Sequence, residues 1–124
     1  MPKLLLVEDE LEVVDTLKDY FQRHGVEVLV ANSGEDGLEL LTAQAPDVVL
    51  LDMKLGAGIS GLEFLRRAKR AKSKAQIIVV TAVDDENVSR MSQGFGPADY
   101  VTKPLTLQDI DRVVLSRLKK VNPA

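Results

Sequence analysis

The sequence contains five short aliphatic runs that lack the regular alternation of apolar and polar residues. They lie at residues 3–7, 26–31, 47–51, 76–80 and 100–101, and they are rich in Val, Leu and Ile. A strand with one face in water alternates strictly, whereas a strand covered on both faces can be apolar throughout. The runs therefore predict strands of a parallel sheet that is buried on both sides.

Stretches with helical spacing separate these runs. In the first, Leu11, Val14, Leu17 and Phe21 fall on one face of a helix that His24 and Gly25 end. Four further helices are expected: one capped by Ser33, one opened by Leu62, one from Asp84 or Asp85 to about Gly94, and one capped by Thr106 that carries Leu107, Ile110, Val113, Val114 and Leu118.

Strands that alternate with helices predict an α/β fold in which right-handed crossovers place helices on both faces of the sheet. The 124 residues suffice for one hydrophobic core. We find no linker and no low-complexity segment, so the chain is expected to form a single domain over residues 1–124, with no output domain following it.

Composition excludes several classes of site. The chain has no cysteine and one histidine, which excludes disulfides, thiolate metal sites and multi-histidine metal sites. A net charge of -3 and an aromatic content of 4% argue against direct binding of nucleic acid. The longest apolar runs have four residues and no secretory leader follows Met1, so neither a membrane span nor secretion is expected and a cytoplasmic location is.

Polar residues follow the predicted strands where ligands of open α/β sheets bind. They are Glu8, Asp9, Asp52, Thr81 and Lys103. Three carboxylates in a small cleft repel one another, and a divalent cation relieves that repulsion. Oxygen ligands without sulfur favour Mg²⁺. Asp52 directly follows the apolar run at residues 48–51 and is the best-placed candidate for a carboxylate nucleophile that forms an aspartyl phosphate.

Each of these residues also has a purely structural interpretation. Glu8 and Asp9 are suited to capping the first helix, Asp52 and Thr81 to turns, and Lys103 to a solvated surface position. Their occurrence together, each at a predicted strand end, favours the functional interpretation.

Four motifs in this order carry a family resemblance: LLLVEDE at residues 4–10, DVVLLDM at 47–53, IIVVTA at 77–82 and DYVTKP at 99–104. With them the chain resembles the receiver domains of two-component response regulators, the CheY-like family. The resemblance covers essentially the whole chain. It implies a flavodoxin-like (βα)5 three-layer sandwich with strand order 2-1-3-4-5, an order that the residue pattern alone does not determine.

The resemblance also implies residue roles. Asp52 is expected to accept a phosphoryl group from a phosphohistidine on a sensor histidine kinase or a histidine phosphotransfer protein. Asp9, Asp52 and the backbone carbonyl of Lys54 are expected to bind Mg²⁺, with Glu8 acting mostly through a metal-bound water. Lys103 is expected to pair with the phosphoryl oxygens.

The same resemblance implies a switch. Thr81 is expected to move towards the phosphorylated Asp52 and Tyr100 to turn inward behind it, while the Lys103–Pro104 bond is expected to be cis. The surface of helix 4, strand 5 and helix 5 would then bind a downstream effector or a second copy in a phosphorylation-dependent homodimer. Such a protein catalyses only its own phosphorylation and dephosphorylation.

Other functions remain open. The chain is also compatible with a receiver excised from a larger hybrid kinase or DNA-binding regulator. An aspartyl-phosphate phosphatase is less favoured, because such enzymes carry a second acid where this chain has Lys54. A flavodoxin-like cofactor binder is less favoured too, because Glu8, Asp9 and Glu10 would repel a phosphate.

The chain departs from its relatives after Asp52. Relatives commonly have a proline four residues after the acceptor, where this chain has Gly56, and with Gly58 this predicts a more mobile loop before metal binds. Lys54 and Val83 are expected to slow the loss of phosphate. The basic run at residues 66–74 is expected to be a solvated helix end, and His24 to be structural.

Overall fold

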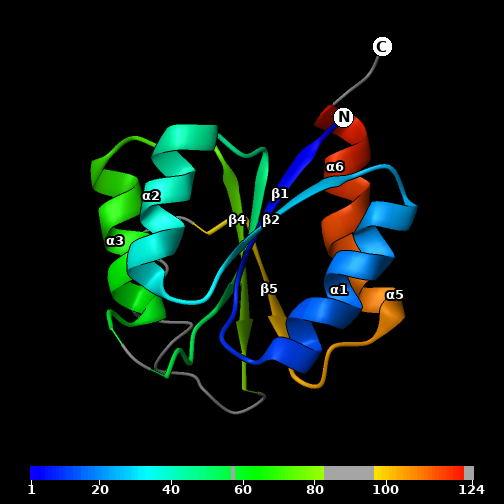
Figure 1. Cartoon of the computed structure of the whole chain (residues 1–124), viewed down its shortest axis with the longest axis horizontal. Helices are drawn as coiled ribbons and strands as arrows, with labels where there is room; N and C mark the ends of the chain where they lie inside the picture. Colours follow the sequence, from blue (N-terminus) through cyan, green and yellow to red (C-terminus); the bar gives the residue numbers. More distant parts are fainter. Residues whose placement is uncertain (57, 83–96, 122–124) are drawn as a thin grey trace.

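A five-stranded parallel sheet forms the centre of the protein in the computed structural model, which describes residues 1–56, 58–82 and 97–121 (Figure 1). The strand order is β2-β1-β3-β4-β5. This order confirms the flavodoxin-like arrangement that the resemblance implies. The strands are β1 (Lys3–Val7), β2 (Glu27–Ala31), β3 (Val48–Asp52), β4 (Gln76–Thr81) and β5 (Asp99–Thr102).

Helices cover both faces of the sheet. In Figure 1, α2 (Gly34–Gln44) and α3 (Gly61–Arg70) lie on one side, and α1 (Leu11–Arg23) lies on the other beside the C-terminal helical stretch. That stretch consists of α5 (Leu107–Asp109), the π-helical segment η2 (Ile110–Leu115) and α6 (Ser116–Val121). The sequence does not predict the π-helical segment. The helix expected from Asp84 or Asp85 to Gly94 lies outside the described residues.

Alternate residues of each central strand belong to two separate hydrophobic cores, one on each face of the sheet. On β1, Leu4 and Leu6 pack towards α1 and the C-terminal helix, whereas Leu5 and Val7 pack towards α2 and α3. The strands β3 and β4 divide their apolar residues in the same way. Because both faces are covered, an apolar residue is favourable at every position, which explains why the aliphatic runs lack alternation.

Hydroxyl side chains cap the N-termini of three helices in the described part of the chain. Ser33, Ser60 and Thr106 accept hydrogen bonds from the N–H groups of Asp36, Glu63 and Asp109, respectively. Such caps satisfy N–H groups that have no partner inside the helix. The helix α1 differs, because its cap residue is Glu10 and makes no side-chain cap hydrogen bond. The interpretation of Asp9 as the cap of this helix is therefore wrong.

The strands β3 and β4 each extend one residue further than the sequence predicts. Asp52 pairs with Val80, and Thr81 pairs with Thr102, within the ladder. Backbone hydrogen bonds of 3.1 Å from Met53 to Val80 and of 2.8 Å from Lys103 to Thr81 continue it. The sheet therefore fixes the backbone positions of Asp52, the candidate phosphoryl acceptor, and of Thr81. Over the described ranges, no helix combines the length and apolar character needed to cross a membrane.

Candidate functional site

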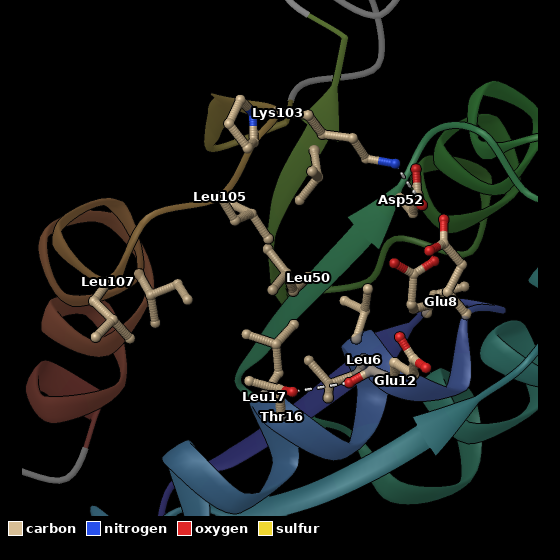
Figure 2. A pocket seen from close by; sticks show the side chains of 16 residues that line it. Leu6, Glu8, Glu12, Thr16, Leu17, Leu50, Asp52, Lys103, Leu105 and Leu107 are labelled. Carbon is tan, nitrogen blue, oxygen red and sulfur yellow. Dashed lines mark hydrogen bonds and ion pairs between the residues drawn. The ribbon is translucent and has the colours of Figure 1, made fainter.

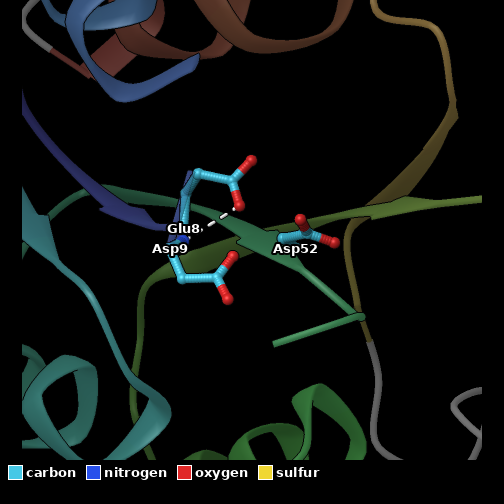
Figure 3. A group of neighbouring side chains, drawn as sticks. All are labelled: Glu8, Asp9 and Asp52. Atoms are coloured by element: carbon cyan, nitrogen blue, oxygen red, sulfur yellow. Dashed lines mark hydrogen bonds between the residues drawn. The ribbon is translucent and has the colours of Figure 1, made fainter. Parts of the chain in front are cut away.

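Three carboxylates meet at the carboxyl end of the sheet (Figure 3). Glu8 and Asp9 follow β1, and Asp52 ends β3, so parallel pairing of these two strands brings them together. One oxygen from each side chain lies within 4.8 Å of the other two. Glu8 and Asp52 are buried, at 7% and 4% exposure, whereas Asp9 is exposed. The cluster therefore has two fixed carboxylates and one at the surface.

The buried carboxylates repel each other. Burial, together with a hydrogen bond and the charge of Asp52, raises the pKa of Glu8 to about 8. Two ionised carboxylates at this distance are unfavourable in a poorly solvated site, so one of them binds a proton more readily. This is the electrostatic setting in which a divalent cation is favourable.

Lys103 supplies the positive charge of the site. Its Nζ donates to Oδ2 of Asp52 at 3.1 Å, and its side chain is 39% exposed. Burial on its own lowers the pKa of Lys103, but Asp52 and the nearby Glu8 and Glu10 outweigh it and leave that pKa above its ordinary value. The peptide bond between Lys103 and Pro104 is cis.

Backbone N–H groups orient all three carboxylates. Lys54 donates to Oδ1 of Asp52 at 2.9 Å, and Asp9 donates to Oε2 of Glu8 at 3.0 Å. Gly56 donates to Oδ2 of Asp9 at 2.7 Å. Hydrogen bonds to a charged acceptor are shorter and stronger than neutral ones. Asp52 therefore has one oxygen on Lys54 and the other on Lys103.

The two candidate switch residues lie on neighbouring strands. Thr81 is buried, at 7% exposure, at the end of β4, which is the strand next to that of Asp52. Tyr100 lies on β5, is half-buried and packs against the core on the α2 and α3 side. The structure thus brings Glu8, Asp9, Asp52 and Lys103 together and places Thr81 on the adjacent strand. Whether Thr81 and Tyr100 move is a separate prediction.

The donor set fits magnesium. Every side-chain donor in the cluster is a carboxylate oxygen, and Mg²⁺ prefers oxygen ligands with few carboxylates from the protein. The backbone of Lys54, whose carbonyl is the predicted fourth ligand, is held next to Asp52 by its N–H. Among the described residues of the site, three carboxylates meet one ammonium group, that of Lys103, so an added cation would balance the charge better.

A groove of about 860 Å³ leads to the buried carboxylates (Figure 2). It lies between α1 and the chain that follows β5. Its floor is apolar, with Leu6 and Leu50 from the sheet and Leu105 beyond the cis bond, while Glu10 and Glu12 add negative charge. Leu107 lies on its wall and is 61% exposed. The sequence does not predict this groove, because residues far apart in the chain form it.

The family of the chain follows from its match to a known family model. The family model described as response regulator receiver domain matches residues 4–115. The chain belongs to this family. It is therefore the receiver domain of a two-component response regulator and serves as a signalling switch.

Relatives of this receiver domain agree with that assignment. It is 38% identical over 120 residues to the transcriptional regulatory protein AfsQ1 of Streptomyces coelicolor, covering 97% of the chain and 52% of that protein. It thus spans about half the length of this relative.

Two solved receiver structures are also similar to the domain. The receiver domain of the TMAO respiratory system response regulator TorR is 34% identical, with a TM-score of 0.85 and coverage of 98% of this chain and 100% of that one. The signal receiver domain of a modulated diguanylate cyclase from Desulfovibrio desulfuricans G20 is 26% identical, with a TM-score of 0.82 and coverage of 97% and 95%.

Proposed function

We propose that Asp52 accepts a phosphoryl group from a phosphohistidine on a sensor histidine kinase or a histidine phosphotransfer protein, in a reaction that requires Mg²⁺. The observation that carries the proposal is the environment of Asp52. Its carboxylate is 4% exposed, lies within 4.8 Å of two other carboxylates and receives Lys103 at 3.1 Å. Burying the Asp52 carboxylate costs desolvation free energy that its pairing with Lys103 only partly offsets, so stability alone does not account for this arrangement.

Glu8, Asp9, Asp52 and the carbonyl of Lys54 would hold the magnesium ion, which supplies positive charge that offsets the charge on the transferring phosphoryl group. Phosphoryl transfer needs an aligned nucleophile and neutralised oxygens more than it needs covalent help from the protein. The Lys54 N–H fixes the Asp52 carboxylate, and Lys103 adds its charge at the same carboxylate. A new O–P bond to Asp52 forms as the P–N bond of the donor breaks.

A phosphorylated Asp52 offers acceptor oxygens that the free carboxylate lacks. Thr81 can then gain a charge-assisted hydrogen bond, and Tyr100 can follow it inward. A ligand shifts a conformational equilibrium only by its differential affinity for the two states, and this new bond supplies that difference. We place the resulting surface change at the helix expected from Asp84 or Asp85 to about Gly94, which lies outside the described residues, together with β5 and the C-terminal helical stretch; a downstream effector or a second copy would bind there.

The groove beside α1 supports a protein donor. Leu107, at the start of α5, lines the same groove as Asp52 and is 61% exposed. An exposed leucine in the groove of a buried nucleophile is suited to the apolar part of a protein interface. We therefore expect the donor protein to carry an apolar patch beside its histidine.

Residues 1–124 form one receiver domain in this proposal, located in the cytoplasm. Its output comes from an effector protein or from a further domain of a longer protein, such as a hybrid kinase or a DNA-binding regulator. Direct binding of nucleic acid by the receiver itself is not part of the proposal, since its net charge is -3.

The test is incubation with acetyl phosphate, with and without Mg²⁺, followed by mass spectrometry of the intact protein. We expect the mass of one phosphoryl group to appear only with Mg²⁺ and to be absent from Asp52→Asn. Release of many phosphates per protein molecule would favour an aspartyl-phosphate phosphatase instead. Absence of any adduct in the parent protein would contradict the proposal.

A further inference from the structure

The loop between β3 and α3 contacts the exposed member of the carboxylate cluster through the backbone of Gly56. The N–H of Gly56 donates to Oδ2 of Asp9 across 2.7 Å, and 47 residues of chain separate the two. This distance is at the short end for a hydrogen bond between an amide and a carboxylate. The contact links the loop directly to the exposed member of the cluster.

Asp9 needs such a partner more than its neighbours do. Glu8 and Asp52 are buried, so the surrounding chain already limits their side-chain rotation. Asp9 is exposed, and an exposed carboxylate samples several rotamers unless a hydrogen bond holds it. The Gly56 N–H therefore selects one orientation of the Asp9 carboxylate.

The position is suited to glycine for two separate reasons. A proline, the residue that relatives commonly carry here, has no N–H to donate. Any other side chain would place its Cβ 2.6 Å from Oδ2 of Asp9, which is closer than such atoms approach. Glycine supplies the donor and lets the Asp9 carboxylate keep this position, whereas a larger side chain would force that carboxylate to shift.

A second, independent contact anchors the same loop. The N–H of Ile59 donates to both carboxylate oxygens of Glu35 on α2, at 3.2 and 3.1 Å. Gly34, on the same turn of α2, leaves room for the side chain of Ile59, because a Cβ there would lie 2.5 Å from Cγ1 of Ile59. Loss of Glu35 would thus loosen the loop without removing the donor to Asp9, which gives a matched control.

We propose that Gly56 is a positioning residue for the metal site, whose N–H holds the Asp9 carboxylate in the orientation that binds Mg²⁺. This inference rests on the proposed function. Hydrogen bonds to metal-ligating side chains commonly change metal affinity by about 10- to 100-fold. Because Asp9 and Gly56 are exposed, the lower end of that range applies.

The test is Mg²⁺ titration by calorimetry of the parent protein and of the variants Gly56→Pro and Glu35→Ala. We expect Gly56→Pro to bind Mg²⁺ about tenfold more weakly and Glu35→Ala to stay within about threefold of the parent. Thermal unfolding without metal shows whether a variant is folded. Equal affinity of the parent and Gly56→Pro would overturn the inference, as would an equal loss in Glu35→Ala.

Amide hydrogen exchange in the parent protein tests the contact without any variant. We expect the Gly56 amide to exchange at least about tenfold more slowly than an unprotected amide, both before and after Mg²⁺ is added. Exchange at the unprotected rate in both states would overturn the inference even if Gly56→Pro fails to fold. A parent protein that binds no Mg²⁺ would instead contradict the proposed function.

Discussion

The ammonium group of Lys103 lies 3.1 Å from Oδ2 of Asp52, although 51 residues separate them in the chain. Asp52 ends β3, and Lys103 follows β5, so the intervening strand β4 sets the distance between them. The other oxygen of Asp52 accepts the N–H of Lys54 at 2.9 Å. Both oxygens of the candidate acceptor are thus engaged in the unphosphorylated protein.

Substitution of Lys103 tests this relationship. We expect Lys103→Met to slow phosphorylation by acetyl phosphate at least about tenfold, because a preorganised charge at the transferring group is lost. Intact-protein mass spectrometry over time measures the rate. The conservative variant Lys103→Arg keeps the positive charge but spreads it over a planar guanidinium group. It should therefore retain more activity than Lys103→Met. Equal rates for the parent and Lys103→Met would contradict the role.

Magnesium should stabilise the parent protein. A ligand that binds only the folded state adds RT ln(1 + [L]/Kd), which is about 1.4 kcal/mol when its concentration is ten times Kd. For a domain of this size, we expect Tm to rise by about 3–8 °C. Asp52→Asn should lose most of this rise, whereas Glu39→Gln, at an exposed position on α2, should keep it. Calorimetric unfolding at constant ionic strength measures both.

The Glu63 carboxylate gives a pH dependence to the stability of α3. Hydrogen bonds from Arg67 and Arg66 hold the pKa of Glu63 below its usual value. An acid whose pKa is lower in the folded state contributes stability above its unfolded pKa and loses it as pH falls through the folded value.

The corresponding variant is Glu63→Gln, which keeps the backbone N–H that donates to Ser60. We expect it to be slightly less stable than the parent at pH 7 and equally stable at pH 2. Denaturant unfolding at both values measures the difference, and high salt should shrink it at pH 7. A difference that persists unchanged at pH 2 would rule out the ion pairs as its cause.

Close packing between α2 and α3 depends on Gly37. A Cβ at this position would lie 2.9 Å from Cε2 of Phe64 and 3.0 Å from Cγ2 of Val7, and Phe64 is fully buried. We expect Gly37→Ala to destabilise the protein by about 1–3 kcal/mol through overpacking. The double variant Gly37→Ala with Phe64→Leu should cost less than the sum of the two single changes. Strict additivity in denaturant unfolding would argue against this contact.

A substitution at Leu107 should affect phosphorylation by a protein donor but not by a small molecule such as acetyl phosphate. Because it is 61% exposed on the wall of the groove, Leu107→Ala should leave folding and phosphorylation by acetyl phosphate unchanged. Transfer from a phosphorylated histidine kinase or phosphotransfer protein should slow about threefold to tenfold, as expected for an interface leucine that contributes about 1 kcal/mol. Equal transfer rates from the protein donor would show that the donor docks elsewhere.

The sequence predicted the sheet well because its signal is local. Each aliphatic run is a strand, since double-sided burial requires apolar residues at every position. The caps at Ser33 and Thr106 also follow from local chemistry and are confirmed. Strand ends were less predictable: Asp52 and Thr81 lie inside strands because the neighbouring backbone, which is distant in sequence, pairs with them.

Side-chain contacts across the fold could not be predicted from the sequence. The alternative role of Asp9 as a helix cap is wrong, because its carboxylate accepts the N–H of Gly56 instead. The absence of proline at position 56 was visible in the sequence, but its partner was not. The groove and the Glu35 contact were missed for the same reason, since they depend on how α1 and α2 pack against distant loops.

The central claim is that Asp52 is the phosphorylated residue, and chemical trapping tests it most directly. Borohydride reduces an acyl phosphate of aspartate to homoserine, which peptide mass spectrometry locates in the sequence. After treatment with acetyl phosphate and Mg²⁺, we predict homoserine at position 52 and at no other aspartate. Unmodified Asp52 in a protein that has gained a phosphoryl group, or homoserine at Asp9 instead, would contradict the account.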